Sequence, residues 1–369
     1  MRFKQEKTRV EMKQIIKSAA VIAACAFATP VFAGGVTIAN DGTSKLKLEG
    51  TVYVGTTDYR VEKSVAPAPL TQTTRTRSTS LDRAYLGVKY YFDDNWMMRI
   101  TSDVNNEKGL GKSQQVFLKY AYLEGKLAGK AAVLRLGQSH TPWIDYEQGL
   151  WKHRYVSKVM SDQFGYDSSS ELGIGLKGDI DMFHYWVTMT DGNSYSSAKT
   201  YKTAGTGEDL SVRLGVTPIE GLTIDLQLIN GFNGTKTSTT AGTKQAFTQF
   251  MVTYGMGNDF RVGANYIADK KTTDATGLPV NKTDAVALWG WANFADNMGA
   301  FARLETQKDK LAVINGQKTN RYVLGLEYNP AKHINLSLAY DDAKVTNLAG
   351  VANDTQRTRR YGLFSQFTF

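Results

Sequence analysis

Apolar and polar side chains alternate in short segments along most of the chain. Residues 222–228 read Leu-Thr-Ile-Asp-Leu-Gln-Leu, and residues 322–328 read Tyr-Val-Leu-Gly-Leu-Glu-Tyr. A period of two is typical of a β-strand with one apolar face and one polar face. About sixteen such segments follow one another, the last of them at 361–369. The pattern predicts an all-β protein.

Two kinds of connection separate these segments. Short turns such as 93–95, 178–179 and 257–258 carry Gly, Asn or Asp, which reverse a strand with little strain. They alternate with long polar stretches near 58–80, 104–114, 139–170, 191–208, 231–245, 269–283, 308–319 and 342–358. This asymmetry is typical of a transmembrane antiparallel β-barrel with short periplasmic turns and long extracellular loops. The alternatives are a soluble barrel or a pair of β-sandwiches, which would bury their apolar rows inside.

Composition agrees with a barrel. The chain has 34 Gly, 19 Tyr and only 7 Pro. A mean hydropathy of −0.34 would ordinarily indicate a soluble protein. In a membrane barrel, however, half of each strand faces a water-filled interior, so a polar average is expected. No stretch after residue 33 approaches the apolar length that a spanning helix needs.

The N-terminal residues predict a secretory signal over 1–33. Lys13 and Lys17 precede the apolar stretch 19–28, and small residues lead to a cleavage site after Ala33. Met12 alone would begin a conventional signal. The alternative is a lipoprotein site at Ile22-Ala-Ala-Cys25, which leaves a shorter apolar core. We therefore expect one barrel domain over 34–369, without the chain's single cysteine.

The net charge and the reactive side chains of the chain argue against several functions. The formal net charge of +9 falls to +5 without residues 1–33, which hold six Lys or Arg and two acidic residues. No Lys/Arg-rich block indicates nucleic acid. No thiol remains for a metal site or a covalent haem, and the four histidines lie in separate segments without metal-ligand spacing. With no Gly-x-Ser-x-Gly motif either, we expect no enzyme, no cofactor and no metal.

The end of the chain resembles the C-terminal strand of bacterial outer-membrane β-barrels. Its apolar positions are Tyr361, Leu363, Phe367 and Phe369, and Phe369 is the last residue. The resemblance implies that these side chains form the signal recognised by the barrel assembly machinery. It also implies an integral, multi-pass location in the outer membrane of a Gram-negative cell.

The chain from residue 34 resembles the sixteen-stranded bacterial porins over essentially its whole length. The resemblance implies that the loop after the fifth strand, at 139–170, folds into the lumen and forms the pore constriction. The aromatic and charged side chains of this loop support that reading, and Gly173 and Gly175 on the next strand leave room for a close approach. The expected constriction residues are Trp143, Asp145, Tyr146, Glu147, Lys152, His153, Arg154 and Lys158. In the alternative, the loop caps the barrel mouth or contacts a neighbouring subunit.

The phasing of the strands sends an excess of basic residues into the lumen. Four of them, on successive strands, form the expected pore wall: Lys89, Arg99, Lys119 and Arg135. Asp145 and Glu147 are expected to face this wall and to create a transverse field, as in general diffusion porins. Rings of basic side chains favour anions. The sequence thus predicts a passive, weakly anion-preferring channel for small hydrophilic solutes.

Three alternatives stay open. Basic residues of the loop, together with residues 135–142, loosely resemble the phosphate-selective porins and suggest an oxyanion-selective channel. A barrel could also sheathe a partner protein, or carry a lipase or protease site. The porin resemblance implies a homotrimer. It further implies contacts with outer-membrane lipid, lipopolysaccharide, the assembly machinery and small hydrophilic solutes, but no nucleic acid.

Overall fold

The computed structural model describes residues 35–65, 68–105, 115–192, 194–197, 209–233, 243–273, 276–310, 316–347 and 354–369. The expected signal, with Met12 and Cys25, lies outside these ranges. Among the described residues, no helix is long and apolar enough to cross a membrane.

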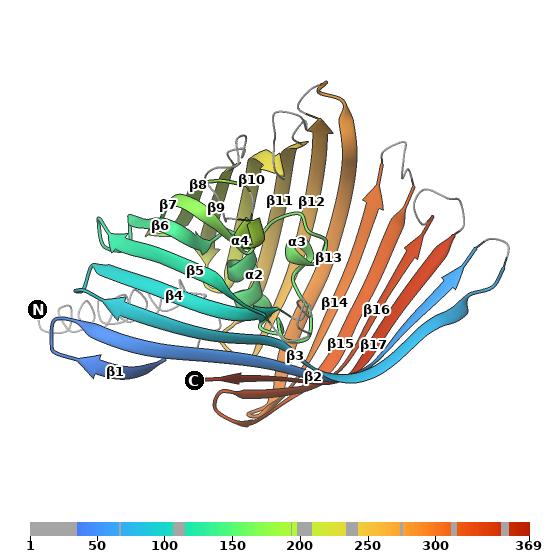
Figure 1. Ribbon diagram of the computed structural model, residues 1–369, viewed down its shortest axis with the longest axis horizontal. Coiled ribbons are helices and arrows are strands. Elements are labelled where there is room, and N and C mark those ends of the chain that lie inside the picture. The colour runs from blue at the N-terminus through green and yellow to red at the C-terminus, as the bar shows by residue number, and fades with distance from the viewer. Residues whose placement is uncertain are drawn as a thin grey trace, which may run out of the picture.

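Sixteen antiparallel strands form a closed barrel (Figure 1). Each strand pairs with the next along the chain, and the last pairs with the first through Thr355–Thr368 and 51–64, which closes the ring. The strands are β2 (Lys45–Ser64), β3 (Thr71–Tyr91), β4 (Trp96–Asn105), β5 (Gln115–Lys126), β6 (Val133–His140), β7 (Ser170–Ile180), β8 (Phe183–Thr190), β9 (Asp209–Ile219), β10 (Leu222–Asn233), β11 (Thr243–Met256), β12 (Phe260–Thr273), β13 (Pro279–Ala295), β14 (Met298–Asp309), β15 (Lys318–Ala331), β16 (Ile334–Thr346) and β17 (Thr355–Thr368).

The two faces of the sheet differ as the alternation predicts. On β15, Leu324 and Leu326 are about half exposed on the outer face, while Val323 is completely buried on the inner face. The same holds around the barrel, where large apolar side chains cover the outside and polar ones line much of the inside. An apolar outer belt is stable only in contact with lipid or another apolar surface.

One strand was not predicted. β1 (Val36–Asn40) pairs with residues 45–48 of β2 and is exposed along its whole length. It lies on the same edge of β2 as β17, beyond the point where Phe369 bonds to Gly50. Because β1 has only five residues and no buried face, its sequence carries little periodic signal.

Several expected loops are in fact strand. The stretch 58–80 lies mostly within β2 and β3, which leaves only residues 65–70 between them. The stretch 269–283 is likewise shortened by β12 and β13. These extensions carry Thr, Ser, Arg and Lys on both faces, so hydrophobic alternation cannot reveal them. Much of the other expected loops, including 106–114, 198–208 and 234–242, lies outside the described residues.

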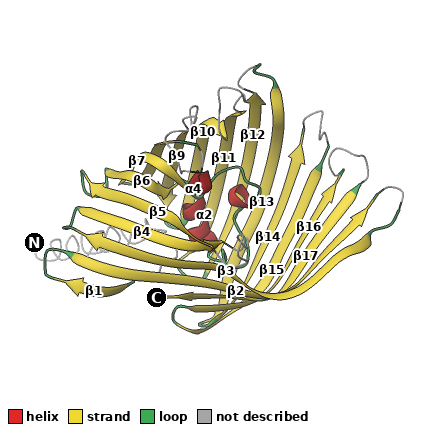
Figure 2. Cartoon of the chain, in the orientation of Figure 1, coloured by secondary structure: helices red, strands yellow, loops and turns green. Residues whose placement is uncertain are grey.

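In the described part of the chain, three short helices lie inside the barrel, as Figure 2 shows. α2 (Ile144–Trp151) and α3 (Met160–Gln163) belong to the loop after the fifth barrel strand, as predicted, and α4 (Ser194–Ser197) follows β8. We refer to residues 141–169, between β6 and β7, as the constriction segment.

Candidate pore constriction

The constriction segment is packed against one side of the inner wall. Trp143 and Trp151 are completely buried in a cluster with Trp289 and Phe301 of β13 and β14. The indole N–H of Trp291 donates to the backbone oxygen of Leu150 at 2.8 Å. Burying such large aromatic side chains contributes several kcal/mol, so the segment is fixed to the wall.

Buried polar contacts add to this packing. Glu147 accepts from Arg303 of β14 at 2.8 Å and from the indole N–H of Trp143 at 2.8 Å. Tyr155 donates to Glu327 of β15 at 2.6 Å. Further anchors reach other strands: Tyr146 donates to Asp225, Arg321 to Ser157, and Arg360 to the backbone oxygen of Val156. Loss of a buried contact such as that between Glu147 and Arg303 would leave a buried polar group with fewer partners, which costs about 1–3 kcal/mol.

The opposite side of the lumen, from β3 to β7, carries the basic wall. All four predicted residues lie there with inward side chains, and Arg83 and Lys177 join them. We define the basic wall as Arg83, Lys89, Arg99, Lys119, Arg135 and Lys177. Three carboxylates, those of Glu49, Asp103 and Glu124, pair with members of the wall. Six positive charges against three negative ones leave the wall net positive.

The pairing follows a simple rule. Glu49 bridges Lys89 and Arg99 at 2.5 and 3.5 Å. In the same way, Glu124 bridges Arg135 and Lys177 at 2.7 and 3.3 Å. One carboxylate thus serves two cations and holds both in place without neutralising them. Rigid cations with residual charge are suited to attract anions.

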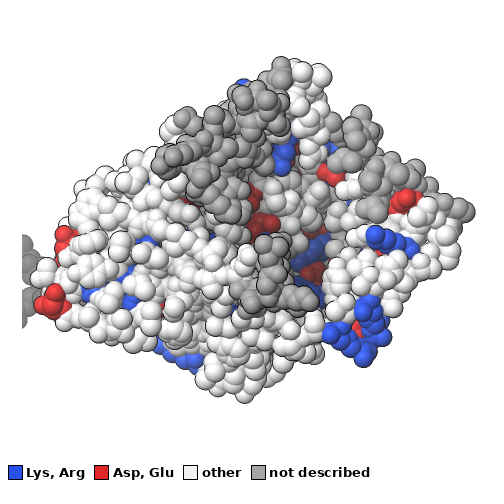
Figure 3. Space-filling view, viewed as in Figure 1, with Lys and Arg blue, Asp and Glu red and all other residues white. Residues whose placement is uncertain are grey.

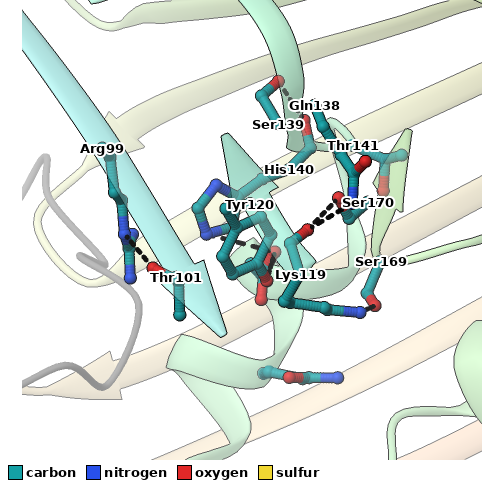
Figure 4. Close-up of polar contacts among 12 residues, drawn as sticks. Arg99, Thr101, Lys119, Tyr120, Gln138, Ser139, His140, Thr141, Ser169 and Ser170 are labelled. Atoms are coloured by element: carbon teal, nitrogen blue, oxygen red, sulfur yellow. Dashed lines mark hydrogen bonds and ion pairs between the residues drawn. The ribbon is translucent and has the colours of Figure 1, made fainter. Parts of the chain in front are cut away.

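Lys119 occupies an unusual position on β5 (Figure 4). The pairing of β4 with β5 shifts between Thr101 and Ser102, which produces a bulge at Lys119 and Tyr120. Both side chains therefore turn into the lumen, where they are 3% and 2% exposed. The Lys119 ammonium donates to Ser169 at 2.5 Å, and Tyr120 stacks on His140 with ring centres 3.9 Å apart.

Asp145 faces the basic wall, as expected. Its carboxylate accepts from Tyr120 at 3.4 Å and lies 3.7 Å from His140 Nε2. Burial raises the pKa of the Asp145 carboxyl to about 6, although the charges of Lys119 and Arg99 act in the opposite direction. Asp145 can therefore change charge near neutral pH.

Glu147 does not face the basic wall, and that expectation was wrong. It points to β14 instead, where Arg303 binds it. Residues advance by about 100° in an α-helix, so positions 145 and 147 of α2 lie on nearly opposite sides.

Four basic residues were expected in the constriction. Two of them, Lys152 and His153, are instead turned away from the basic wall, toward the strands β13 to β15 on which the segment packs. Lys152 donates to Asn258 at 3.1 Å and lies over the ring of Trp291. His153 stacks on Phe301 with ring centres 4.0 Å apart, and its Nε2 is 3.6 Å from Glu327.

Arg154 and Lys158 remain on the lumen side, joined by an acid that the sequence did not single out. Asp162 of α3 accepts from Lys158 at 3.0 Å and lies 3.5 Å from Arg154. Burial acts to raise the pKa of Asp162, but the charges of Arg154 and Lys158 outweigh it and lower the pKa. Asp162 also interacts electrostatically with Arg83 and Lys119 of the basic wall. The segment and the wall thus meet through charged groups, and Figure 3 shows such groups inside the hollowed face of the barrel.

The two glycines of β7 do not make room for the segment. A Cβ on Gly173 would lie 2.1 Å from the backbone oxygen of Met189, and one on Gly175 would lie 3.0 Å from Thr188. Both contacts are with the neighbouring strand β8, so the expected reason for these glycines was wrong.

The C-terminal aromatic residues lie on the outer face. Tyr361, Leu363, Phe367 and Phe369 are all more than a third exposed. Phe369 exchanges two backbone hydrogen bonds with Gly50, and a Cβ at Gly50 would lie 1.9 Å from its ring. This geometry suits a closing strand. Recognition by the assembly machinery stays a prediction.

One histidine, His184, lies between a carboxylate and a hydroxyl group, an arrangement that also occurs in hydrolase active sites. His184 Nδ1 lies 2.8 Å from Asp179, and its Nε2 lies 3.0 Å from the hydroxyl of Thr217. The backbone N–H of Thr217 donates to the backbone oxygen of Met182 at 2.8 Å. We interpret these contacts as structural, because they join β7, β8 and β9 near the short turn between β7 and β8. Within the described ranges, no group of three or more His, Cys, Asp or Glu side chains could hold a metal ion.

Comparison with known proteins supports the fold. No family model and no curated protein matches the chain. Among solved structures, the anion-selective porin from Comamonas acidovorans has a TM-score of 0.62 at 14% identity, over 88% of this chain and 100% of that one. The outer-membrane channel DcaP of Acinetobacter baumannii has a TM-score of 0.60 at 12% identity, over 89% and 99%. OmpT of Vibrio cholerae in its trimer form has a TM-score of 0.57 at 14% identity, over 89% and 100%.

Because the sequence identities are so low, these similarities are evidence for a shared fold only. The chain has the sixteen-stranded fold of outer-membrane porins, and its apolar outer surface fits an integral β-barrel of the outer membrane.

Proposed function

We propose that the protein is a passive channel for small hydrophilic solutes and ions, with a weak preference for anions. The observation that carries the proposal is the net-positive basic wall opposite a constriction segment fixed inside the barrel. Such a segment narrows the lumen, and the charged groups around the gap then decide which ions pass.

The preference is expected to be weak because acids also line the gap. Asp145 and Asp162 of the segment both interact with Lys119. The oxyanion-selective alternative rested partly on Lys152 and His153. These side chains contact Asn258 and Glu327 on the opposite side from the basic wall. A sheath for a partner protein would gain nothing from a segment packed tightly into its own lumen.

The test is a single-channel recording from purified protein in a planar bilayer under a salt gradient. We expect stepwise conductance and a reversal potential that indicates anion preference. Exchanging Arg99, Lys119 and Arg135 for Glu should shift the reversal potential toward cation preference, since three substitutions lower the net charge of one wall by about six units. A control variant replaces Lys130 and Lys332, which lie on exposed short turns, with Glu and should leave the reversal potential unchanged. No conductance from a folded barrel would overturn the channel proposal.

The channel is proposed to be a homotrimer. β6 and β8 have eight residues each, fewer than the 9–11 that a transmembrane strand commonly needs. Their outer side chains, including Leu136 and Met189, are apolar and about half exposed. A neighbouring copy of the chain would cover the apolar outer face of these short strands. Native mass spectrometry in detergent should give three times the mass of one chain.

A further inference from the structure

The chain that follows β8 enters the lumen, although the stretch 191–208 was expected to be an external loop. The backbone N–H of Asp191 donates to the backbone oxygen of Leu172 at 3.0 Å, which keeps the chain beside β7 as it leaves β8. α4 then packs against β5 and β7, and Figure 1 shows it inside the barrel. In the described part of this stretch, a second segment therefore lies beside the basic wall.

Tyr195 is the residue of α4 that reaches the basic wall. Its ring stacks on the ring of Phe117 on β5, with ring centres 5.3 Å apart and planes inclined by 14°. The Lys119 ammonium lies 3.5 Å from the centre of the same Tyr195 ring. Tyr195 also interacts electrostatically with Arg83. Because the face of an aromatic ring attracts a cation at this distance, the contact with Lys119 holds α4 against the wall.

The local structure of β5 makes this contact possible. Phe117 pairs with Asp103 of β4 and lies two positions before Lys119, so both side chains point into the lumen next to each other. The bulge then brings the ring of Tyr120 to 5.8 Å from the Lys119 ammonium. The hydroxyl of Ser169 accepts from the same ammonium. The Lys119 ammonium is thus enclosed by three elements, namely β5, α4 and the constriction segment.

This enclosure distinguishes Lys119 from the other lysines of the basic wall. Lys119 is 3% exposed, whereas the side chains of Lys89 and Lys177 are 19% and 28% exposed. Glu49 and Glu124 bind Lys89 and Lys177 with negative charge. The hydroxyl group and the rings that contact Lys119 carry no net charge. They therefore cover the Lys119 ammonium without neutralising it.

We propose that Tyr195 is a selectivity-determining residue of the pore, because its ring covers the Lys119 ammonium and limits the direct contact of anions with the basic wall. This inference rests on the channel function proposed above and adds to it. The ring and a passing anion compete for the same ammonium. The strength of the anion preference is then set by α4 as well as by the constriction segment.

The first test locates anions without measuring ion conduction. Crystals of the native protein and of Tyr195→Ala are soaked in bromide, and anomalous scattering shows where bromide binds. In Tyr195→Ala we expect bromide in contact with the Lys119 ammonium, because the ring no longer covers it. In the native protein and in Tyr195→Phe, which keeps the ring, the density at this position should be several-fold weaker relative to bromide bound elsewhere on the barrel.

The second test measures the reversal potential in a planar bilayer under a salt gradient. Tyr195→Ala should raise the ratio of anion to cation permeability by about twofold, the factor that corresponds to an exposed cation–π contact. Tyr195→Phe should behave as the native channel. The matched control is Tyr322→Ala, which removes a tyrosine ring that is 47% exposed on the outer face and should leave the ratio unchanged.

A double-mutant cycle decides whether the effect of Tyr195 passes through Lys119. In a Lys119→Met background, Tyr195→Ala should leave the permeability ratio unchanged, since no ammonium remains to be covered. A shift of the same size with and without Lys119 would overturn the proposal and assign the effect to a general widening of the lumen. The heat-dependent mobility of each variant on a gel checks its folding.

Two further results would overturn the proposal. Equal bromide density at Lys119 in the native protein and in Tyr195→Ala would show that the ring does not exclude anions. A native permeability ratio in a conducting Tyr195→Ala channel would show that the cover over Lys119 does not affect selectivity. If the native barrel conducts no ions while bromide reaches Lys119 only in Tyr195→Ala, the channel proposal fails and the cover over Lys119 is supported.

Discussion

At the scale of single residues, burial and pairing decide which charges act in the lumen. Asp145 is an acid that faces cations yet has a raised pKa, because removal from water outweighs the attraction. Asp162 sits between two cations of its own segment and has a lowered pKa. Near neutral pH, Asp162 therefore keeps its charge while Asp145 can lose it.

This difference predicts a pH dependence of ion preference. Below pH 6, Asp145 binds a proton and becomes neutral, so the constriction becomes more positive and anion preference should increase from pH 7.5 to pH 5. The measurement is the reversal potential at both values. In Asp145→Asn the carboxyl is absent, so anion preference at pH 7.5 should be higher than in the native channel and the shift with pH should be smaller. A remaining shift is expected from Asp167 of the same segment, because burial raises the pKa of its carboxyl to about 7.

A shift of undiminished size in Asp145→Asn would show that Asp145 does not contribute to the pH dependence. The charged and titratable groups that interact with Asp145 include Tyr53, Arg99, Lys119, Tyr120, Arg135, His140, Arg154 and Asp162. Asp162→Asn serves as the matched control, because it removes a carboxylate whose charge is constant over this range. It should raise anion preference equally at both pH values.

At the scale of elements, the constriction segment is a loop that behaves as part of the wall. Its backbone makes few regular pairs, but α2 is buried on the side that carries Glu147 and Trp151. Anchors to β10, β13, β14, β15 and β17 distribute its attachment over half of the barrel. The position of the segment thus depends on many contacts with distant strands.

Loss of the Glu147 anchor should loosen the segment. Glu147→Gln removes the charge that pairs with Arg303, while Arg303 keeps Glu305 at 2.6 Å. We expect a destabilisation of about 2 kcal/mol, the cost of an impaired buried hydrogen bond to a charged group. Single-channel currents should become noisier, and protease should cleave the segment faster in the folded barrel. Native current noise in this variant would contradict the anchoring role.

At the scale of the whole molecule, closure depends on the last strand. β17 pairs with β2 along fourteen residues, from Thr355 to Thr368, and Phe369 adds two backbone bonds to Gly50. A barrel has no free edge only when this seam is complete. The strand therefore closes the barrel.

Deleting Phe369 should reduce assembly in cells more than folding in isolation. The seam loses two backbone bonds and one aromatic contact, which is a modest part of its length. If Phe369 is also read by the assembly machinery, the yield in the outer membrane should fall several-fold, while refolding into lipid vesicles should change little. The conservative variant Phe369→Tyr should assemble normally. Equal losses in both experiments would reduce the residue to a structural role.

Much of the fold was predictable, and the misses have physical causes. The strand extensions at 58–64 and 71–80 lie where both faces meet polar surroundings, so no apolar period marks them. The bulge that brings Lys119 and Tyr120 to the same face breaks the period of two on which phasing depends. Arg83 was not predicted to line the lumen because it lies close to the stretch 58–80, which was expected to be a loop.

By itself, the sequence determined most of the strands, their order and the face on which most of their side chains lie, because neighbouring strands pair in chain order and each period is local. Only the tertiary structure decided which groups meet across the lumen. Glu147 and Arg303 are 156 residues apart, and Tyr155 and Glu327 are 172 apart. Such contacts depend on the curvature of the closed barrel and on the path of one loop inside it, which no local pattern encodes.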